Sequence, residues 1–267
     1  MKTFIKIFSF LFFFSLLFIC SLRLQNIYQY AKSQDSTQNR RKICGEDSLY
    51  VFLIGDSWVY LHRNYDTQLS SIISKKGFPC RVLSEGYGGA NSKEVYLWTF
   101  SSCMPLFTRN SAYCVIIVGI NDAVAKLGKD FYSYHYELIL QQLLKMEIKP
   151  VVLEIPDVNY RAIASREPWK KRMRHILSSL LTGSEQYGFD SYKTALIKAI
   201  RETNMQNQVV YISADLWNPE GYYDPRGLYL PDETHLNAKG YEVLDSCIAS
   251  EIIKDILKNS NNKYICQ

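Results

Sequence analysis

The chain has 267 residues, of which 47% are hydrophobic and 21% are charged, a globular composition with enough length for one substantial core. The net charge of +5 is concentrated at one end, because residues 1–33 hold four of the 31 basic residues and none of the 26 acidic ones. The remainder carries 27 basic and 26 acidic residues. It therefore lacks the basic surplus of a nucleic-acid-binding domain.

Residues 1–24 are predicted to be a targeting segment. A basic start precedes an uncharged apolar run over residues 7–22, as in a signal peptide. The run is short for a spanning helix, which needs about 20 apolar residues. Because Lys6 and Arg23 can reach the interfaces from its ends, an uncleaved membrane anchor is an equal alternative. Lipidation of Cys20 is a third, less favoured alternative, and all three export the domain that follows.

Residues 25–47 are polar and are predicted to be a linker to one domain, residues 48–267. In that domain, short apolar segments alternate with segments of helical periodicity. The predicted strands are residues 50–54, 80–86, 112–119, 149–156 and 207–213. The predicted helices are residues 58–77, 92–100, 130–148, 167–181, 190–203 and 238–258. Val- and Ile-rich strands separated by helices indicate an α/β fold with a parallel sheet, whose site lies at the carboxyl ends of the strands.

Six cysteines lie outside the targeting segment: Cys44, Cys80, Cys103, Cys114, Cys247 and Cys266. An even number in an exported domain permits disulfides, but their pairing is open. Free buried thiols are the alternative. The absence of a Cys-x-x-Cys pair disfavours a structural zinc site.

Reactive side chains follow the predicted strands, which points to acyl transfer. Ser57 comes directly after the first strand, and its hydroxyl is a weak nucleophile until a base removes the proton. His235 can be that base, and Asp232, three residues earlier, can hold the imidazole in the required tautomer. Taken alone, Ser57 is better explained as a helix N-cap. The serine is interpreted as a nucleophile only because the other segments accompany it.

A tetrahedral intermediate also needs hydrogen-bond donors for its oxyanion. Three are predicted: the backbone N–H of Ser57, the backbone N–H of Gly86 and the side-chain amide of Asn121. Gly86 has no Cβ and lets the backbone approach a substrate closely. The absence of Gly-x-Ser-x-Gly argues against an α/β-hydrolase nucleophile elbow.

Four segments in this order resemble the blocks of the SGNH, or GDSL-type, hydrolases. They are "IGDSW" (54–58), "SEGYGGANS" (84–92), "VGIND" (118–122) and "PDETHLNAKGY" (231–241). The resemblance implies that Ser57 is the nucleophile, that Gly86 and Asn121 complete the oxyanion hole, and that His235 and Asp232 are base and orienting acid. It also implies a flavodoxin-like three-layer α/β/α sandwich with about five parallel strands, and neither metal nor cofactor. The second block departs from the family, which often has Asn where this chain has Ser84.

Several other residues have structural interpretations. Asp56 is expected to bond nearby backbone in a turn, and Asp122 is expected to cap the segment that follows it. Three histidines in helical stretches are predicted to be surface or packing residues: His62, His135 and His175. The basic run 170–175 is usually a solvated helix face, with binding of anionic glycans or lipid headgroups as the alternative.

The expected function is an exported serine esterase that cleaves small acyl esters, with O-acetyl groups on a carbohydrate as the favoured substrate. Trp58 and Tyr87 are the candidates for the walls of its pocket. The alternatives are an O-acetyltransferase with the same machinery, a lipolytic esterase or lysophospholipase, and a non-catalytic tethered binding module. The expected partners are the ester substrate and, if the targeting segment stays uncleaved, a membrane. The sequence indicates no protein partner.

Overall fold

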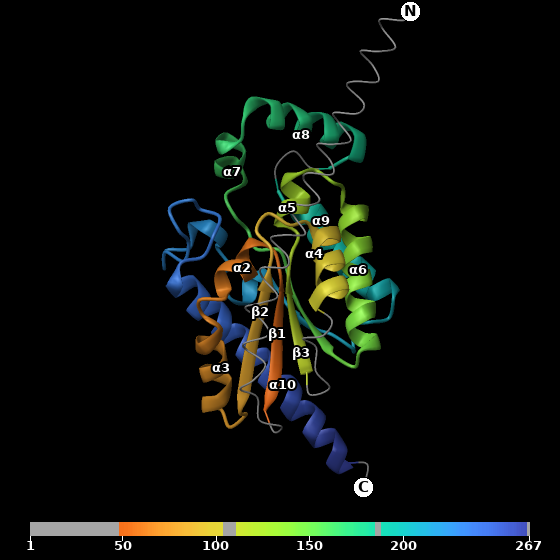
Figure 1. The fold of residues 1–267 in the computed structure, drawn as a ribbon, viewed down its shortest axis with the longest axis vertical. Helices are drawn as coiled ribbons and strands as arrows, with labels where there is room; N and C mark the ends of the chain where they lie inside the picture. Colours follow the sequence, from red (N-terminus) through yellow and green to blue (C-terminus); the bar gives the residue numbers. More distant parts are fainter. Residues whose placement is uncertain (1–47, 104–110, 185–187, 266–267) are drawn as a thin grey trace, which may run out of the picture. The chain divides into compact units, whose positions relative to one another are not determined.

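The computed structural model describes residues 48–103, 111–184 and 188–265 (Figure 1). The predicted targeting segment and linker lie outside these residues, and both stay predictions. Within the described part of the chain, no helix combines the length and the apolar character that crossing a bilayer requires.

Five strands form one parallel sheet. They are β1 (Leu49–Gly55), β2 (Cys80–Gly86), β3 (Ser111–Ile117), β4 (Lys149–Leu153) and β5 (Val210–Ile212). Their order across the sheet is β2-β1-β3-β4-β5, and every neighbouring pair is parallel. This is the flavodoxin-like order, whose direction of winding reverses between β1 and β3. The predicted fold is confirmed, and the reversal places a site where these two strands end.

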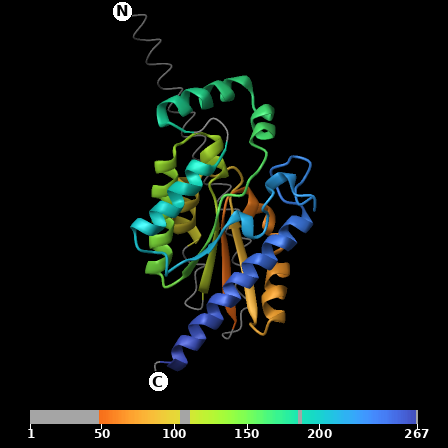
Figure 2. The ribbon, with the colours of Figure 1, turned by 180° about the vertical axis from the view of Figure 1, so that it is seen from behind.

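Helices cover both faces of the sheet. They are α2 (Ser57–His62), α3 (Asp66–Lys75), α4 (Ser92–Trp98), α5 (Ile120–Val124), α6 (Lys129–Lys145), α7 (Tyr160–Arg166), α8 (Trp169–Thr182), α9 (Asp190–Glu202) and α10 (Ala238–Ile265). Helix α3 packs against α10, whereas α6 packs against both α4 and α9. Figure 2 shows α10 crossing one face of the sheet, with α6 and α9 beside each other. The three layers are therefore helix, sheet and helix.

The positions of the apolar residues along each strand and helix determine which side chains form the core. The side chains of β1 from Val51 to Ile54 are at most 3% exposed, because this strand is central and covered on both faces. Helix α6 buries Tyr132, Tyr136, Ile139 and Leu143, which recur at the three- and four-residue intervals of one helical face.

The predicted helix over residues 58–77 is two helices, α2 and α3. The chain turns at residues 63–65, where the N–H of Tyr65 bonds the carbonyl of His62 at 2.7 Å and interrupts the helical ladder. Apolar spacing does not detect such a break, because the apolar positions continue in register on both sides of it. Two helices were not predicted, α5 and α7. Both are shorter than the window in which helical periodicity is visible.

Three cysteines in the described part of the chain are free thiols: Cys80, Cys114 and Cys247. Burial raises the pKa of the Cys80 thiol to about 12 and that of Cys247 to about 11, so both are protonated at neutral pH. The side chains of Cys44, Cys103 and Cys266 lie outside the described part of the chain, so disulfides among these three stay a prediction.

Candidate active site

Ser57 lies at the carboxyl end of β1, as the first residue of α2. The strand ends at Gly55, where a Cβ would lie 2.0 Å from the carbonyl oxygen of Ile117 in β3. Asp56 caps α2, because its Oδ1 accepts the N–H of Trp58 at 3.0 Å. The alternative in which Ser57 itself is the N-cap is therefore wrong. The cap is the residue before it, which leaves the half-buried Ser57 hydroxyl available to other partners.

The structure brings Ser57, His235 and Asp232 together. Nε2 of His235 lies 2.9 Å from Oγ of Ser57, and Nδ1 of His235 lies 2.6 Å from Oδ2 of Asp232. A carboxylate accepts hydrogen bonds only, so Nδ1 carries a proton and Nε2 of the neutral ring is an acceptor for the serine hydroxyl. This is the geometry in which an imidazole can remove the hydroxyl proton.

Asp232 is held as a carboxylate. Its Oδ1 accepts the backbone N–H groups of Thr234 and His235, each at 2.9 Å, while Oδ2 accepts the imidazole proton. Burial by itself raises the pKa of Asp232, but these hydrogen bonds outweigh burial and hold that pKa below its usual value. The acid therefore stays charged at neutral pH and fixes the tautomer of His235.

The loop that carries Asp232 and His235 is tied to two helices. Nε1 of Trp58 in α2 donates to the carbonyl oxygen of Thr234 at 3.1 Å. From α7, Nη2 of Arg166 donates to the carbonyl oxygen of Asp232 at 2.7 Å and to Oγ1 of Thr234 at 3.0 Å. These contacts fix the loop relative to Ser57.

Trp58 and Tyr87, the two aromatic residues predicted to line a pocket, do not present an open surface. Trp58 is fully buried and packs edge-on against Trp217 and Tyr229. Tyr87 is partly buried and lies edge-on against Trp98. Trp58 sits next to Ser57 in sequence, but on an α-helix the following side chain points about 100° away, here into the core.

Gly86 is a packing residue rather than a suitable oxyanion donor. A Cβ at this position would lie 2.0 Å from the backbone nitrogen of Tyr60, so the glycine lets β2 approach α2. The N–H of the next residue, Tyr87, donates to the carbonyl oxygen of Gly55 in β1. The carbonyl oxygen of Gly86 instead accepts a hydrogen bond from Arg63 at 3.2 Å. The N–H and C=O of one strand residue point to the same side, so the Gly86 N–H points away from β1.

Asn121, in α5, lies beside Asp56 and beside a turn that contains glycine. Its Nδ2 donates to the carbonyl of Ala90 at 3.0 Å and lies 3.5 Å from Oδ2 of Asp56. The turn that ends at Ala90 includes Gly89, which has φ of +77° and open space around the position of a Cβ. The amides of this exposed turn are therefore better placed than Gly86 to face a substrate. The spacing of glycines did not distinguish the packing glycine from the exposed one.

Asp122 does not cap the segment after it. It lies inside α5, is fully buried, and accepts the N–H of Ser92 at 2.9 Å and the Ser92 hydroxyl at 2.5 Å. Burial raises its pKa to about 7, although the hydrogen bonds from Ser92 oppose the rise. Burial also raises the pKa of Asp56 to about 7 against the hydrogen bond from Trp58, and the charge of Asp122 adds to that rise.

A buried polar cluster beneath the site was not foreseen. His62 is fully buried, and its Nε2 lies 2.7 Å from Oδ1 of Asp245 in α10. Its Nδ1 lies 3.2 Å from the Ser84 hydroxyl and 3.3 Å from Asp66, which Ser84 also contacts. Burial lowers the pKa of His62, but the two carboxylates reverse the effect and raise it to about 9. Ser84, where the family often has Asn, thus serves this cluster.

The other two histidines differ from each other. His175 is buried and its Nδ1 lies 3.0 Å from Glu167, whereas His135 is partly buried and contacts the carbonyl of Phe131. Neither contacts the Ser57–His235–Asp232 group in the structure. Over residues 48–103, 111–184 and 188–265, no three His, Cys, Asp or Glu side chains are grouped so that they could share a metal ion.

Among the comparisons with known proteins, only the comparison of structures supports the fold. No protein-family model matches the sequence, and no curated protein matches it. An acetyl xylan esterase, AlAXEase, superposes with a TM-score of 0.51 at 19% identity, covering 78% of this chain and 99% of the other. A lipase/acylhydrolase from Enterococcus faecalis gives 0.54 at 16% identity, covering 76% and 94%. A psychrotrophic esterase, EstA, from Pseudoalteromonas sp. gives 0.52 at 12% identity, covering 79% and 98%. The chain has the SGNH-hydrolase fold.

Proposed function

We propose that this chain is a serine esterase that cleaves small acyl esters through an acyl-enzyme. The observation that carries the proposal is the hydrogen-bonded series from Ser57 Oγ to His235 Nε2 and from His235 Nδ1 to Asp232 Oδ2. Each member has the partner and the orientation that its role requires.

The geometry supports a two-step reaction. In the first step Nε2 of His235 takes the proton of Ser57 while Oγ attacks the ester carbonyl, and the imidazolium then protonates the departing alcohol. In the second step His235 takes a proton from water, and the water attacks the acyl-serine. The imidazolium then returns this proton to Oγ of Ser57 as the acyl–Oγ bond breaks and the carboxylic acid leaves. Throughout, Asp232 stays ionised and stabilises the imidazolium.

The oxyanion is stabilised by donors at the carboxyl ends of β1, β2 and β3. Ser57 is the first residue of α2, where backbone N–H groups have no partner within the helix. Asn121 contributes its side-chain amide, whose Nδ2 donates to Ala90 at 3.0 Å and makes a longer contact of 3.5 Å with Asp56. As the third donor we propose a backbone N–H of the turn at Gly89 in place of Gly86. Donors of this kind, fixed before the reaction, contribute much of the rate acceleration in acyl transfer.

The preferred substrate class is an O-acetylated carbohydrate outside the cell. Two features support it: the predicted targeting segment at residues 1–24, and the similarity in fold to a protein named as an acetyl xylan esterase. An O-acetyltransferase would use the same three residues and pass the acyl group to a sugar hydroxyl instead of water. A lysophospholipase would prefer long acyl chains.

A fluorophosphonate probe tests the nucleophile. The wild-type chain is expected to be labelled, Ser57→Ala is expected not to be, and Ser165→Ala, which alters an exposed serine of α7, serves as the matched control. Unlabelled wild type, or equal labelling of Ser57→Ala, would overturn the proposal.

The substrate is tested separately. Release of acetate from acetylated xylan, and a preference for acetyl over octanoyl nitrophenyl esters, is the result expected for an acetylesterase. Product that forms only when a sugar acceptor is added would identify the transferase instead, and a preference for the octanoyl ester would identify a lipolytic enzyme.

A further inference from the structure

Helix α8 is amphipathic with its polar side turned toward the protein. The Ser178 hydroxyl donates to the carbonyl oxygen of Lys126 at 2.8 Å, and Oγ1 of Thr182 donates to the same oxygen at 3.2 Å. On the same side His175 is 6% exposed and pairs with Glu167. Polar side chains thus hold this helix against the rest of the protein. An ordinary surface helix instead packs against the protein with its apolar stripe.

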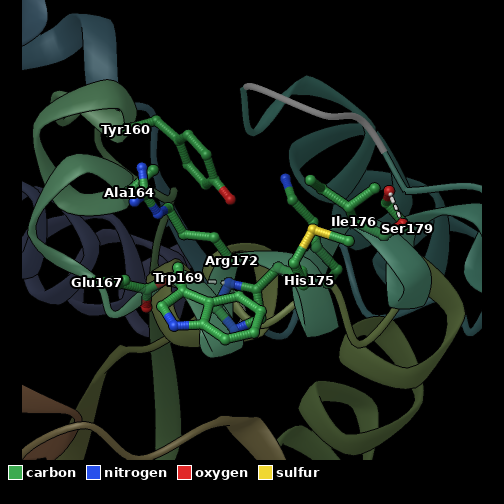
Figure 3. A pocket seen from close by; sticks show the side chains of 10 residues that line it. Tyr160, Ala164, Glu167, Trp169, Arg172, His175, Ile176 and Ser179 are labelled. Atoms are coloured by element: carbon green, nitrogen blue, oxygen red, sulfur yellow. Dashed lines mark hydrogen bonds and ion pairs between the residues drawn. The ribbon is translucent and has the colours of Figure 1, made fainter.

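The opposite side is apolar and open to solvent. We call the following six residues the apolar face of α8: Trp169, Met173, Ile176, Leu177, Leu180 and Leu181. Their side chains are 45% to 81% exposed, with Leu180 at 76% and Leu181 at 81%. At 100° per residue they span about 140° of the helix. Figure 3 shows Trp169, Arg172 and Ile176 around a hollow that Tyr160 faces, so part of this face lines an open space.

Cations border the apolar face on both edges. By helical position, Arg172 lies along one edge and Arg174 along the other, whereas Lys170 lies just inside the second edge; all three are exposed. No acidic residue occurs in the helix, residues 169–182. An exposed apolar stripe with basic edges and a tryptophan is the pattern of a helix that lies in the interface of an anionic bilayer.

We propose that the apolar face of α8 docks on an anionic lipid bilayer. The apolar side chains enter the headgroup region, and the flanking cations contact lipid phosphates. Two other occupants fit less well. A second copy placed face to face would bring two sets of like charges together. An anionic glycan would contact the cations and leave the six apolar side chains in water.

Docking there would bring the bilayer close to the loop that carries Asp232 and His235. Figure 1 shows α7 and α8 beyond the end of the sheet at which β1 terminates. Helix α7, just before α8, contacts the loop directly, since Arg166 bonds the carbonyl of Asp232 and the N–H of Asn159 bonds that of Glu233. This proposal does not depend on esterase activity, because it concerns only what the helix binds.

The test uses Trp169 as a local reporter, because a predicted N-terminal anchor would hold any full-length variant on vesicles. The full chain is reconstituted into phosphatidylglycerol vesicles with brominated acyl chains, which quench tryptophan by contact. Of the four tryptophans, Trp169 is the one exposed at 64%, and Trp169→Phe is expected to remove the quenching. In phosphatidylcholine vesicles the quenching is expected to be weaker, since each basic side chain strengthens binding to an anionic surface by about fivefold.

Paired variants give the decisive comparison. Leu180→Ser with Leu181→Ser is expected to reduce the quenching at least about fivefold, whereas Leu257→Ser, at an exposed leucine of α10, is expected to leave it unchanged. Circular dichroism and hydrolysis of soluble nitrophenyl acetate are expected to match wild type in both, which separates failed docking from failed folding or catalysis. Equal quenching in the double variant and wild type would overturn the proposal. So would a wild-type dimer in detergent that the double variant converts to a monomer, since a second copy would then be the occupant.

Discussion

Trp58 and Thr234, 176 residues apart, are joined by a buried hydrogen bond of 3.1 Å from the indole N–H to the backbone carbonyl oxygen. This bond connects the helix that begins with Ser57 to the loop that carries Asp232 and His235. The distance between Ser57 and His235, the proposed nucleophile and base, is therefore set in part by a residue that has no chemical role of its own. Trp58 is a positioning residue.

Replacing Trp58 with Phe keeps an aromatic side chain but removes the donor and leaves a small cavity. We expect the free energy of unfolding to fall by about 2–3 kcal/mol. We also expect kcat to fall about tenfold while KM changes little, because the loop loses a tether but the substrate contacts remain. Denaturant unfolding and steady-state kinetics on a nitrophenyl ester measure both effects.

Trp217→Phe is the matched control. Trp217 is buried against Trp58, but its indole N–H has no hydrogen-bond partner among the residues that the structure describes. Removing that N–H should cost less stability than the Trp58 change and leave kcat near wild type. A larger kcat loss from Trp217→Phe than from Trp58→Phe would contradict the positioning role.

Replacing Asp232 with Asn tests the orienting acid. The amide still accepts backbone N–H groups, but it no longer stabilises the imidazolium or enforces the tautomer of His235. We expect kcat to fall about 10⁴-fold with little change in the free energy of unfolding. Glu233→Gln changes the neighbouring exposed acid, which faces Asn159, and should retain most activity. Comparable losses in the two variants would show that local charge, rather than the Asp232–His235 bond, is what matters.

Three glycines in one segment separate packing from catalysis. Gly86→Ala places a Cβ against the backbone of Tyr60 and should lower the free energy of unfolding by more than about 3 kcal/mol. Gly89→Ala strains a position with φ of +77° by about 1–2 kcal/mol. It should lower kcat/KM at least about tenfold, because a methyl group then stands beside the proposed donor. Gly88→Ala meets open space and should behave like wild type. A stable Gly86→Ala with reduced kcat would restore Gly86 as the donor.

The buried His62 predicts a pH-dependent stability. Its pKa is about 9 in the folded chain and near 6.5 when unfolded, so the folded state holds a proton that the unfolded state releases between these values. The stabilisation is complete below pH 6.5 and is lost as pH rises through 9, amounting to about 3 kcal/mol. His62→Gln should be less stable at pH 6 and should lack this dependence. Urea unfolding of both proteins from pH 6 to pH 10 measures the difference, and parallel curves would contradict the assignment.

The sequence predicted the order of strands and helices along the chain, because the alternation of buried strands and periodic helices extends over the whole domain. Ser57, Asp232, His235 and Asn121 were predicted for a related reason, since each follows a strand or precedes the last helix, and the structure brings the first three into hydrogen-bond contact. The prediction that failed concerned a local contact. Gly86 resembled a substrate-facing glycine, and only the backbone of Tyr60 at its side shows that it is a packing contact.

One further prediction failed because of side-chain direction, and one pairing was not predicted at all. Trp58 adjoins Ser57 in sequence, yet one step along a helix turns it into the core. His62, in a helical stretch, was predicted to be a surface or packing residue, and its burial agrees with packing. Its pairing with Asp245 was not predicted, because Asp245 lies 183 residues away. Spacing within a segment carries no information about a pairing of that length. Buried polar clusters are for this reason visible only in three dimensions.

The separation between Ser57 and His235, 178 residues, has a consequence for synthesis. Domains fold as their chains emerge from the ribosome, N-terminal parts first. Here the serine is made early and the imidazole near the end, and β1 is flanked by strands made after it. A nascent chain therefore carries Ser57 without His235, and the proposed acyl chemistry becomes possible only after residues 230–237 have left the exit tunnel and closed onto α2.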